Sequence, residues 1–286
     1  MKGIVLAGGS GTRLYPSTLA VCKQLLPIYD KPMIYYPLSI LMLAGIREIL
    51  IISTEDDTPR FQKIFHDGSH LGLQISYTIQ SRPDGIAQAF LIAEPFLKSD
   101  SVSLILGDNL FYGHQLSEIV QRAAQLTSGG LIFGYAVKNP QYYGVVSFDD
   151  QMRVTDIEEK PKHPKTNYAV PGLYFYGPDV VEMTKTLKAS ARGELEITDL
   201  NRLYHQQQRL RIELLGRGIS WLDTGSFDTY HKASSFVQTL QERQGIKIAC
   251  LEEIAYRMGY ISHPQLIELA KRFSRNEYGE YLNNLV

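Results

Sequence analysis

Apolar and polar positions form two different patterns along the first part of the chain. Short apolar runs predict strands at residues 2–7, 48–54, 74–80 and 102–108. Between these runs, apolar residues recur at helical spacing over residues 33–44, 59–66 and 86–97. Strands that alternate with helices predict a mainly parallel sheet with helices on both faces. A ligand of such a sheet binds beyond the carboxyl ends of the strands, where residues 8–13, Gln80 and Asp108 fall.

From about residue 131 the pattern becomes rich in strands with short connections. It predicts strands at residues 131–137, 143–148, 154–158, 168–176 and 210–215. We interpret them as a mixed sheet that extends the first one, because no linker rich in Pro, Gly or Ser separates the two parts. Residues 241–286 have helical spacing, and Ser262 opens one helix in a capping-box sequence. The expected fold class is therefore α/β, with a mixed, mainly parallel central sheet flanked by helices and a helical C-terminal tail.

Composition narrows the classes of function. The 286 residues are 44% hydrophobic and carry 29 basic against 30 acidic side chains, so no overall positive field favours nucleic acid. No apolar stretch approaches the roughly 20 residues of a membrane span, and the N-terminal apolar run is too short for a signal peptide. Cys22 and Cys250 lie far apart without the spacing of a metal site. We expect both to be reduced, as in a cytoplasmic protein.

A glycine-rich loop follows the first predicted strand. Residues 8–13 read GGSGTR, in which the glycines let backbone N–H groups point at an anion and Arg13 adds a fork of donors for phosphate oxygens. The loop lacks the GK[ST] ending of a Walker A loop and the G-x-G-x-x-G spacing of a dinucleotide site. It predicts phosphate binding, and a tight turn without a ligand stays open as the alternative.

Two carboxylates follow predicted strands and are candidates for a metal site. Asp108 ends the run LILGD, and Asp223 ends WLD, two residues before a glycine. A carboxylate at the end of a buried strand needs a partner, and Mg²⁺ accepts one or two carboxylates together with substrate phosphates. A helix or turn cap is the alternative for Asp108, and a cap of the helix near Ser226 is the alternative for Asp223.

Other polar residues at strand ends carry weaker signals. Glu158 and Glu159 point to opposite faces of a strand, so only one of them can face a pocket. Lys160 and Lys23 could each meet a phosphate as a point charge, although solvated surface positions are the alternative. Gly144 begins a strand and permits close approach of a ligand, or forms an ordinary hairpin.

Together these segments resemble the sugar nucleotidyltransferases, and among them the thymidylyltransferase branch that uses glucose 1-phosphate. The similarity covers essentially the whole chain. It is carried by residues 6–14 (LAGGSGTRL), 23–37 (KQLLPIYDKPMIYYP), 83–89 (PDGIAQA), 106–109 (LGDN), 143–146 (YGVV), 158–161 (EEKP), 193–198 (GELEIT) and 221–225 (WLDTG). The run at 23–37 and the helical tail are specific to that branch.

The resemblance implies a Rossmann-like nucleotide-diphospho-sugar transferase fold and a reaction. In that reaction dTTP and α-D-glucose 1-phosphate give dTDP-glucose and pyrophosphate, by direct in-line attack on the α-phosphorus with Mg²⁺. It further implies a nucleotide half at about 1–130, a sugar-phosphate half at about 131–240, and a helical extension at 241–286 that contacts other subunits. Related enzymes are homotetramers, dimers of dimers, with an allosteric site for a dTDP-sugar at a subunit interface.

On the nucleotide side, the resemblance assigns a role to each matching position. Arg13 neutralises the departing pyrophosphate, Lys23 neutralises charge near the α-phosphate, and Gln80 and Gly85 read the thymine edge. The nucleotide-binding set is Gly8, Gly11, Thr12, Arg13, Lys23, Gln24, Gln80, Gly85 and Asp108.

On the sugar side, the resemblance lets Lys160 hold the sugar phosphate, helped by Arg192, and chooses Glu159 over Glu158 for the sugar hydroxyls. The sugar-phosphate set is Asn109, Gly144, Glu159, Lys160, Val170 and Arg192. Asp108 and Asp223 hold the metal ion. The residues assigned to catalysis are Arg13, Lys23, Lys160, Asp108 and Asp223.

The chain departs from the family pattern near both substrates. Ser81 and Arg82 stand where the family usually has Pro and Ser, next to the expected base site, and Pro171 replaces a Thr next to the expected sugar site. Base and sugar selectivity are therefore open. A nucleotidyltransferase for another base or sugar, such as UTP or glucosamine 1-phosphate, is the near alternative. A non-catalytic nucleotide-sugar sensor is the alternative from another class.

Overall fold

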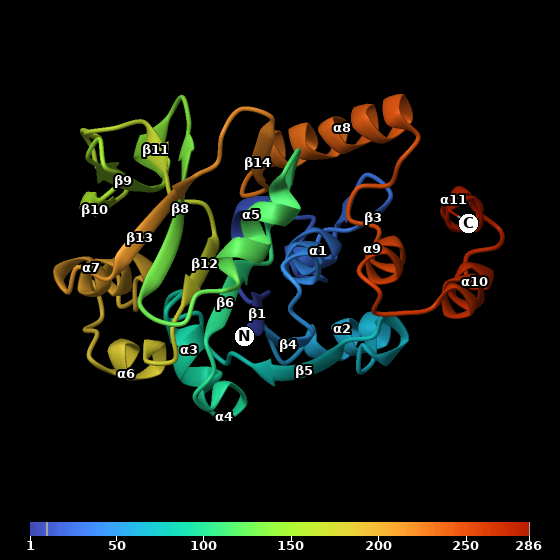
Figure 1. Cartoon of the computed structure of the whole chain (residues 1–286), viewed down its shortest axis with the longest axis horizontal. Helices are drawn as coiled ribbons and strands as arrows, with labels where there is room; N and C mark the ends of the chain where they lie inside the picture. Colours follow the sequence, from blue (N-terminus) through green and yellow to red (C-terminus); the bar gives the residue numbers. More distant parts are fainter. Residues whose placement is uncertain (10, 286) are drawn as a thin grey trace.

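A mixed sheet of ten strands forms the centre of the computed structural model, which describes residues 1–9 and 11–285 (Figure 1). The strand order is β10-β9-β11-β8-β12-β6-β1-β4-β5, and β13 pairs with β8 beside this path. The strands are β1 (Lys2–Leu6), β4 (Glu48–Ser53), β5 (Gln74–Ile79), β6 (Val102–Leu106), β8 (Gly130–Ala136), β9 (Gly144–Phe148), β10 (Val154–Glu159), β11 (Tyr168–Ala169), β12 (Leu173–Tyr176) and β13 (Leu210–Leu214).

The half of the sheet built from β6, β1, β4 and β5 is parallel. Val5 lies between Ile51 and Ile105 in this register, and all three are fully buried. Strands buried on both faces read as continuous apolar runs, which is why the sequence located them. The antiparallel strand β12 joins β6 to β8 and so extends the same sheet. The predicted α/β fold with a mixed, mainly parallel sheet is confirmed.

Helices cover both faces of the sheet. Alternate residues of the central strands belong to different core clusters: Val5 packs with α1 and α5, and Ile4 packs with α3, α6 and α7. The helices are α1 (Tyr35–Leu43), α2 (Thr58–Phe65), α3 (Gln88–Ile92), α4 (Glu94–Leu97), α5 (Leu116–Ala123), α6 (Val180–Lys185), α7 (Ile197–Gln206), α8 (Phe227–Gln244), α9 (Leu251–Arg257), α10 (His263–Lys271) and α11 (Glu277–Asn283). Short 3₁₀ turns occupy Thr12–Leu14, Lys23–Leu25, Ser69–Leu71 and Pro140–Tyr142.

Two predicted elements are interrupted by proline. The helix expected at 86–97 is divided into α3 and α4 at Ala93, and Pro95 lies in the first turn of α4, where its missing N–H costs nothing. The strand expected at 168–176 is divided into β11 and β12 around Pro171 and Gly172. Proline donates no hydrogen bond to a neighbouring strand, so pairing stops there.

Two small antiparallel pairs lie outside the main sheet. In one, β7 (Asn109–Gly113) pairs with β14 (Ile219–Asp223), which brings residues from the middle and the end of the chain together. In the other, β2 (Pro27–Ile28) and β3 (Lys31–Pro32) form a hairpin. The sequence predicted the strand end at Asp223, whereas β7 and the β2–β3 hairpin were not predicted.

The C-terminal helices α9, α10 and α11 lie at the end of the molecule opposite β9, β10 and β11 (Figure 1). Leu251, Ala255 and Leu266 belong to the same buried cluster as α1, so these helices share a core with the sheet. The predicted capping box is present, because Gln265 Oε1 accepts a hydrogen bond from the backbone N–H of Ser262 at 2.8 Å.

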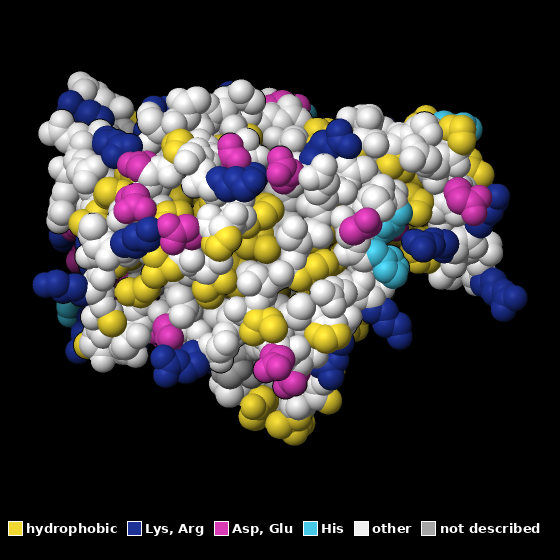
Figure 2. Space-filling view, turned by 90° about the horizontal axis from the view of Figure 1, so that it is seen from below, with side chains coloured by type: hydrophobic (Ala, Val, Ile, Leu, Met, Phe, Trp, Pro, Cys, Tyr) yellow, Lys and Arg dark blue, Asp and Glu magenta, His cyan; other side chains and the backbone are white. Residues whose placement is uncertain are grey.

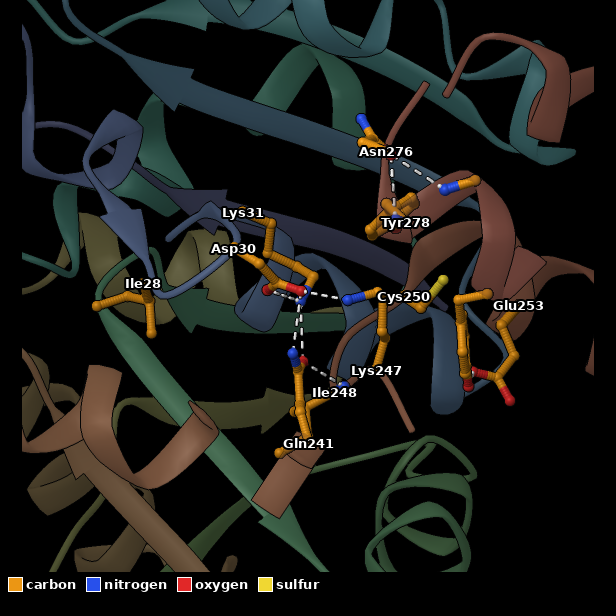
Figure 3. A network of polar contacts seen from close by, with 12 residues as sticks. Ile28, Asp30, Lys31, Gln241, Lys247, Ile248, Cys250, Glu253, Asn276 and Tyr278 are labelled. Carbon is orange, nitrogen blue, oxygen red and sulfur yellow. Dashed lines mark hydrogen bonds and ion pairs between the residues drawn. The ribbon is translucent and has the colours of Figure 1, made fainter. Parts of the chain in front are cut away.

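A buried polar network joins the β2–β3 hairpin to α8 and to the start of the C-terminal segment (Figure 3). Asp30 accepts hydrogen bonds from Lys31 (2.5 Å), Gln241 (2.9 Å) and Lys247 (3.0 Å). The amide oxygen of Gln241 also accepts from Lys31 Nζ and from the backbone N–H of Ile248. The turn at Asp30 is therefore an attachment point of the C-terminal segment, and its charged side chains form the contacts.

Surface charge is mixed on the face shown in Figure 2, where Lys and Arg side chains are interspersed with Asp and Glu. Among the described residues, no helix is both long and apolar enough to cross a membrane.

Candidate active site

A cavity of about 380 Å³ opens at the carboxyl ends of β1 and β6. It is lined by thirteen of the residues that the sequence and its family resemblance singled out: Gly8, Gly11, Thr12, Arg13, Lys23, Gln24, Asp108, Asn109, Gly144, Glu159, Lys160, Val170 and Asp223. Gln80, Gly85 and Arg192 lie outside this lining.

The glycine loop forms one wall of the cavity. Gly11 has a left-handed backbone (φ 59°), and the Thr18 hydroxyl donates to its carbonyl at 2.8 Å. Residues 12–14 continue as a 3₁₀ turn, so Thr12 and Arg13 point into the space beyond β1. The Arg13 guanidinium lies beside Gly225, which follows the strand end that carries Asp223. Ser10 of the loop lies outside the described residues.

Gly8 and Gln80 are packed against each other at the side of this wall. A Cβ atom at Gly8 would lie 2.6 Å from Gln80 Oε1, so only glycine fits there without moving the amide. Gln80 Nε2 donates to Gln88 Oε1 at 2.6 Å. Gly85 is left-handed (φ 108°), and a Cβ there would lie 2.4 Å from the carbonyl of Leu195. These contacts place Gln80 and Gly85 next to the cavity rather than on its lining.

Lys23 forms an ion pair with Asp108 at the centre of the cavity wall. Asn109 Nδ2 donates to the other oxygen of the same carboxylate at 2.8 Å. Burial raises the pKa of Asp108, but the ammonium of Lys23 and these hydrogen bonds outweigh it, so the pKa lies below its ordinary value. Asp108 is therefore ionised at neutral pH. Its side chain serves as the partner of Lys23 and not as a turn cap.

Asp223 lies close to Asp108 because of the β7–β14 pairing. Asp223 faces Asn109 in the ladder, and the Thr224 hydroxyl donates to the Asp108 carbonyl at 3.0 Å. The Tyr143 hydroxyl donates to Asp223 Oδ2 at 3.1 Å, and burial together with this carboxylate raises the pKa of Tyr143 to about 12. The alternative that Asp223 caps a helix is wrong, because Ser226 and Thr229 form the capping box of α8.

The chemistry of these two carboxylates fits a hard divalent cation. Both line the cavity, and neighbouring strands bring them together. In the part of the chain that the structure describes, no group of three or more His, Cys, Asp or Glu side chains could hold a metal ion. A cation between Asp108 and Asp223 would thus need further oxygen ligands from a bound molecule or from water.

The opposite wall is built from β9, β10 and α7. Glu159 Oε2 accepts from the Thr198 hydroxyl at 2.6 Å, and Lys160 Nζ lies 3.2 Å from Glu159 Oε1. Glu158 points to the other face and lies 3.9 Å from Lys165. The expectation that only one of the two glutamates faces the pocket is confirmed, and it is Glu159 that does so.

Arg192 lies at the edge of this wall. Its guanidinium is 2.8 Å from Glu196, 3.4 Å from Glu194 and 4.0 Å from Glu159. The side chain is half exposed and held by carboxylates, so a bound anion would have to compete for it.

Several lining residues had no individual role assigned from the sequence, although Gly9 lies in the predicted phosphate loop. They are Gly9, Leu14, Ile86, Leu106, Tyr142, Tyr143, Gly172, Tyr174, Ile197, Thr198, Asn201, Trp221 and Gly225. Trp221 could have been found, because strand alternation places it on the same face as Asp223. Its indole N–H donates to Asn109 Oδ1 at 2.6 Å, and the backbone N–H of Gly172 donates to the same oxygen at 3.0 Å.

One polar atom in the wall is left without a partner. Gln24 is 3% exposed, and its Oε1 has no hydrogen-bond partner within the described residues. A buried acceptor that lines a cavity is satisfied most simply by a donor on a ligand.

Comparisons with known proteins identify the family. The sequence profile of the nucleotidyl transferase family matches residues 2–239. A glucose-1-phosphate thymidylyltransferase of Neisseria meningitidis is 56% identical over 100% of this chain and 99% of its own length. One of Mycobacterium tuberculosis is 54% identical with the same coverage.

Solved structures show the same fold. A Bacillus anthracis structure assigned as a glucose-1-phosphate thymidylyltransferase, in complex with sucrose, superposes with a TM-score of 0.76 at 36% identity, over 82% of this chain and 94% of that one. A UDP-glucose pyrophosphorylase with bound UDP-glucose has a TM-score of 0.73 at 25% identity, over 84% and 98% of the two chains.

Proposed function

This chain belongs to the nucleotidyl transferase family, and we propose that it is a glucose-1-phosphate thymidylyltransferase. It transfers a thymidylyl group from dTTP to α-D-glucose 1-phosphate, giving dTDP-glucose and pyrophosphate. The observation that carries the proposal is a single cavity with cationic side chains on opposite walls, Arg13 and Lys23 on one and Lys160 on the other, around two carboxylates. Such a cavity can hold two phosphorylated molecules at once.

The glycine-loop wall takes the nucleotide in this proposal. Backbone N–H groups of Gly8, Gly11 and Thr12 hold the phosphates, and Arg13 neutralises the pyrophosphate as it leaves. Gln24 supplies its buried acceptor to the nucleotide. Gln80 and Gly85 contact the thymine, which extends from the cavity toward them.

The β9–β10 wall takes the sugar phosphate. Lys160 pairs with the phosphate, and Arg192 leaves its carboxylate partners to assist. Glu159 is held by Thr198 so that its other oxygen can accept a hydrogen bond from a sugar hydroxyl. Asn109, Gly144 and Val170 complete the sugar site.

Asp108 and Asp223 would hold Mg²⁺, which neutralises phosphate charge when it is bound. The residues of the chain then act by positioning and by electrostatics. The two walls align a phosphate oxygen of glucose 1-phosphate with the α-phosphorus of dTTP. A new P–O bond forms there, the bond to the β-phosphate oxygen breaks, and pyrophosphate leaves toward Arg13.

We also propose the assembly and setting that the family suggests. The chain forms a homotetramer, a dimer of dimers, in which residues 241–286 contact other subunits, and a dTDP-sugar regulates it at a subunit interface. Residues 1–130 form the nucleotide half and residues 131–240 the sugar-phosphate half. The buried, unpaired cysteines support a reducing, cytoplasmic location.

The decisive experiment is a panel of nucleoside triphosphates against sugar 1-phosphates, with pyrophosphate release as the readout. We expect the highest kcat/KM with dTTP and glucose 1-phosphate, and no release when the sugar phosphate or Mg²⁺ is left out. Arg82 has an 82% exposed side chain, so the panel should include UTP to test whether it alters base selectivity.

Two other outcomes would redirect the proposal. Faster turnover with UTP would favour a uridylyltransferase, which the structural likeness to a UDP-glucose pyrophosphorylase makes the second candidate. Tight nucleotide binding without turnover of any pair would favour a nucleotide-sugar sensor.

A further inference from the structure

Both oxygens of the Asp108 carboxylate are already occupied by donors of the chain itself. Lys23 pairs with Oδ2, and Asn109 donates to Oδ1. We propose that Lys23 is a resident cation that occupies the metal position on Asp108 in the free enzyme and is exchanged for the metal only when the nucleotide binds. The inference rests on the proposed function and adds the order in which the site is loaded.

Of the two donors on Asp108, only Lys23 is free to leave. Asn109 is 4% exposed, and its own oxygen is held by the indole of Trp221 and the backbone of Gly172. The Lys23 side chain is 19% exposed and has four rotatable methylene groups, so its ammonium can swing within the cavity that it lines. Asp108 Oδ2 is thus the oxygen that a metal ion could reach.

The free enzyme needs a cation at this point. Asp108 and Asp223 line the same cavity, and the Thr224 hydroxyl next to Asp223 donates to the Asp108 carbonyl. Within the described residues, the donor on the Asp223 side chain is the neutral Tyr143 hydroxyl. A carboxylate in a partly buried wall loses hydration when it is unpaired, and a second carboxylate in the same cavity adds to the negative charge there. The ion pair with Lys23 compensates the charge of Asp108 without a metal ion.

The nucleotide makes the exchange favourable. Two carboxylates are a poor site for a free divalent ion, which needs further oxygen ligands, and triphosphate oxygens provide them. The same phosphates offer the Lys23 ammonium a new anionic partner beside the glycine loop. Charge therefore stays balanced at every stage: ammonium on Asp108 before binding, then metal on Asp108 and ammonium on phosphate.

The order of loading follows. A divalent ion alone should bind the free enzyme weakly, because it must displace Lys23 without giving it a new partner. dTTP without metal should also bind poorly, because it would draw Lys23 away from Asp108 and leave that carboxylate unpaired. The metal–nucleotide complex is the species that the cavity accepts.

Binding of Mn²⁺ to the full-length, nucleotide-free protein, followed by electron paramagnetic resonance, tests the exchange without any need for turnover. For the wild type we expect a dissociation constant weaker than about 1 mM. Lys23→Cys should bind Mn²⁺ at least about tenfold more tightly, because Asp108 is uncovered. Combining Lys23→Cys with Asp108→Asn should return binding to the weak wild-type level.

Alkylation of the Lys23→Cys protein supplies a matched pair of side chains from one folded precursor. Bromoethylamine restores an ammonium at this position, and iodoacetamide adds a neutral amide of similar length. The native Cys22 and Cys250 are buried, and burial with the nearby Asp57 carboxylate raises the pKa of Cys22 to about 12, so at about pH 8.5 the introduced thiol reacts first. Tight Mn²⁺ binding should be lost with the ammonium and kept with the amide.

Equal Mn²⁺ affinity in the wild type and the neutral variants, or tight binding to the nucleotide-free wild type, would overturn the exchange. Lys23→Met and Lys23→Gln replace the cysteine variant in the titration if it does not fold. The proposed function fails separately: wild-type protein that releases no pyrophosphate from dTTP and glucose 1-phosphate would refute the function whatever the Mn²⁺ data show.

Discussion

Gly8 carries no side chain because the amide of Gln80 fills the space beside its Cα. Similar single contacts set the other groups of the site: Thr198 fixes Glu159, Tyr143 fixes one oxygen of Asp223, and Asn109 is fixed by Trp221 before it reaches Asp108. At the scale of the residue, the site therefore depends on neighbours that hold each group in place.

Gly8→Ala tests the contact with Gln80. The new methyl would lie 2.6 Å from Gln80 Oε1, which can move because it is the end of a flexible side chain. We expect the KM for dTTP to rise about tenfold, or roughly 1.4 kcal/mol, with nearly unchanged stability. Steady-state kinetics measures this, and Gly216→Ala, which meets open space, is the matched control. An unchanged KM would show that Gln80 does not contact the nucleotide.

Asp108→Asn removes the charge while keeping the shape. Turnover should fall by at least about 10³-fold, because a carboxylate of the proposed metal site is lost. The pKa of Asp108 is lowered in the fold, so its stabilising pair with Lys23 is present above the unfolded pKa of 3.8 and is lost as the pH falls through the folded value.

The free energy of unfolding at neutral pH should accordingly drop by about 1–3 kcal/mol in Asp108→Asn, and its fall in acid should become shallower. Urea titrations at several pH values measure both effects, with the exposed Asp228→Asn as the control. Full activity in the asparagine variant would rule out Asp108 as a catalytic residue.

At the scale of the element, α8 and the β2–β3 hairpin lie alongside each other. The Tyr230 hydroxyl donates to the Pro27 carbonyl, and Ser234 Oγ accepts from the Tyr29 N–H at 3.0 Å. The helix begins just after Asp223, and the hairpin begins just after the turn that carries Lys23. Both elements therefore connect the cavity with the polar network of Asp30 and Gln241.

Gln241→Leu tests that network. The change leaves Lys31, Asp30 and the Ile248 N–H with fewer partners in a buried place, so we expect a loss of about 2–4 kcal/mol in the free energy of unfolding. Gln238 lies about one turn earlier on the same helix, and within the described residues its side chain bonds to the exposed Glu242 alone, so Gln238→Leu should cost less than about 0.5 kcal/mol. Urea unfolding compares the two variants. Equal losses in the free energy of unfolding would show that the hydrogen bonds of Gln241 contribute no more to stability than those of Gln238.

Glu252 gives the C-terminal helices a dependence on pH. Burial raises the pKa of this carboxyl, which accepts a hydrogen bond from the Tyr278 hydroxyl at 2.6 Å. Because the folded pKa is raised, its contribution to stability is full below the unfolded pKa of 4.5 and is lost as the pH rises through the folded value. Ionisation of Glu252 at high pH therefore lowers the free energy of unfolding.

Glu252→Gln keeps an acceptor for Tyr278 and cannot ionise. The variant should lack the decline of stability with rising pH and should be at least as stable as the wild type at about pH 8. Thermal unfolding from pH 5 to 8 measures it, with the exposed Glu280→Gln as the control. If the stability of the variant declined with rising pH as steeply as that of the wild type, another titratable group would be responsible for the pH dependence.

At the scale of the whole molecule, the C-terminal helices and the sheet share one buried cluster. Leu266 of α10 is fully buried in the cluster that also contains Val5 of β1. We therefore expect the tail and the α/β part to unfold together, although the family profile ends at residue 239.

Leu266→Ala makes this cooperativity measurable. The cavity left by the change should cost about 2–5 kcal/mol. Trp221, the single tryptophan of the chain, lines the active-site cavity and reports on its unfolding by fluorescence. If the chain unfolds as a single cooperative unit, the unfolding midpoint reported by Trp221 fluorescence should shift by the amount that corresponds to the whole loss of stability. The exposed Leu19→Ala is the control, and an unmoved Trp221 midpoint would show that the tail unfolds alone.

The sequence by itself determined the features that depend on neighbouring residues. Buried parallel strands are continuous apolar runs, so β1, β4, β5 and β6 were predicted to within two residues of their ends. The glycine loop and the capping box of Ser262 are local patterns too, and they were predicted for the same reason. Pro95 and Pro171 were visible in the sequence, yet their effect on the predicted helix and strand was not anticipated.

Only the tertiary structure decided which groups meet. The pairing of β7 with β14 brings together the segments that carry Asp108 and Asp223, and α7 supplies Thr198 and Asn201 to the cavity, although the sequence had assigned neither residue a role. Lys23 and Asp108 are separated by 85 residues, and no local pattern specifies that one would cover the other. Periodicity reports how one element is buried, whereas a site depends on long-range packing between elements, and this is why the partners of Asp108 emerged only from the fold.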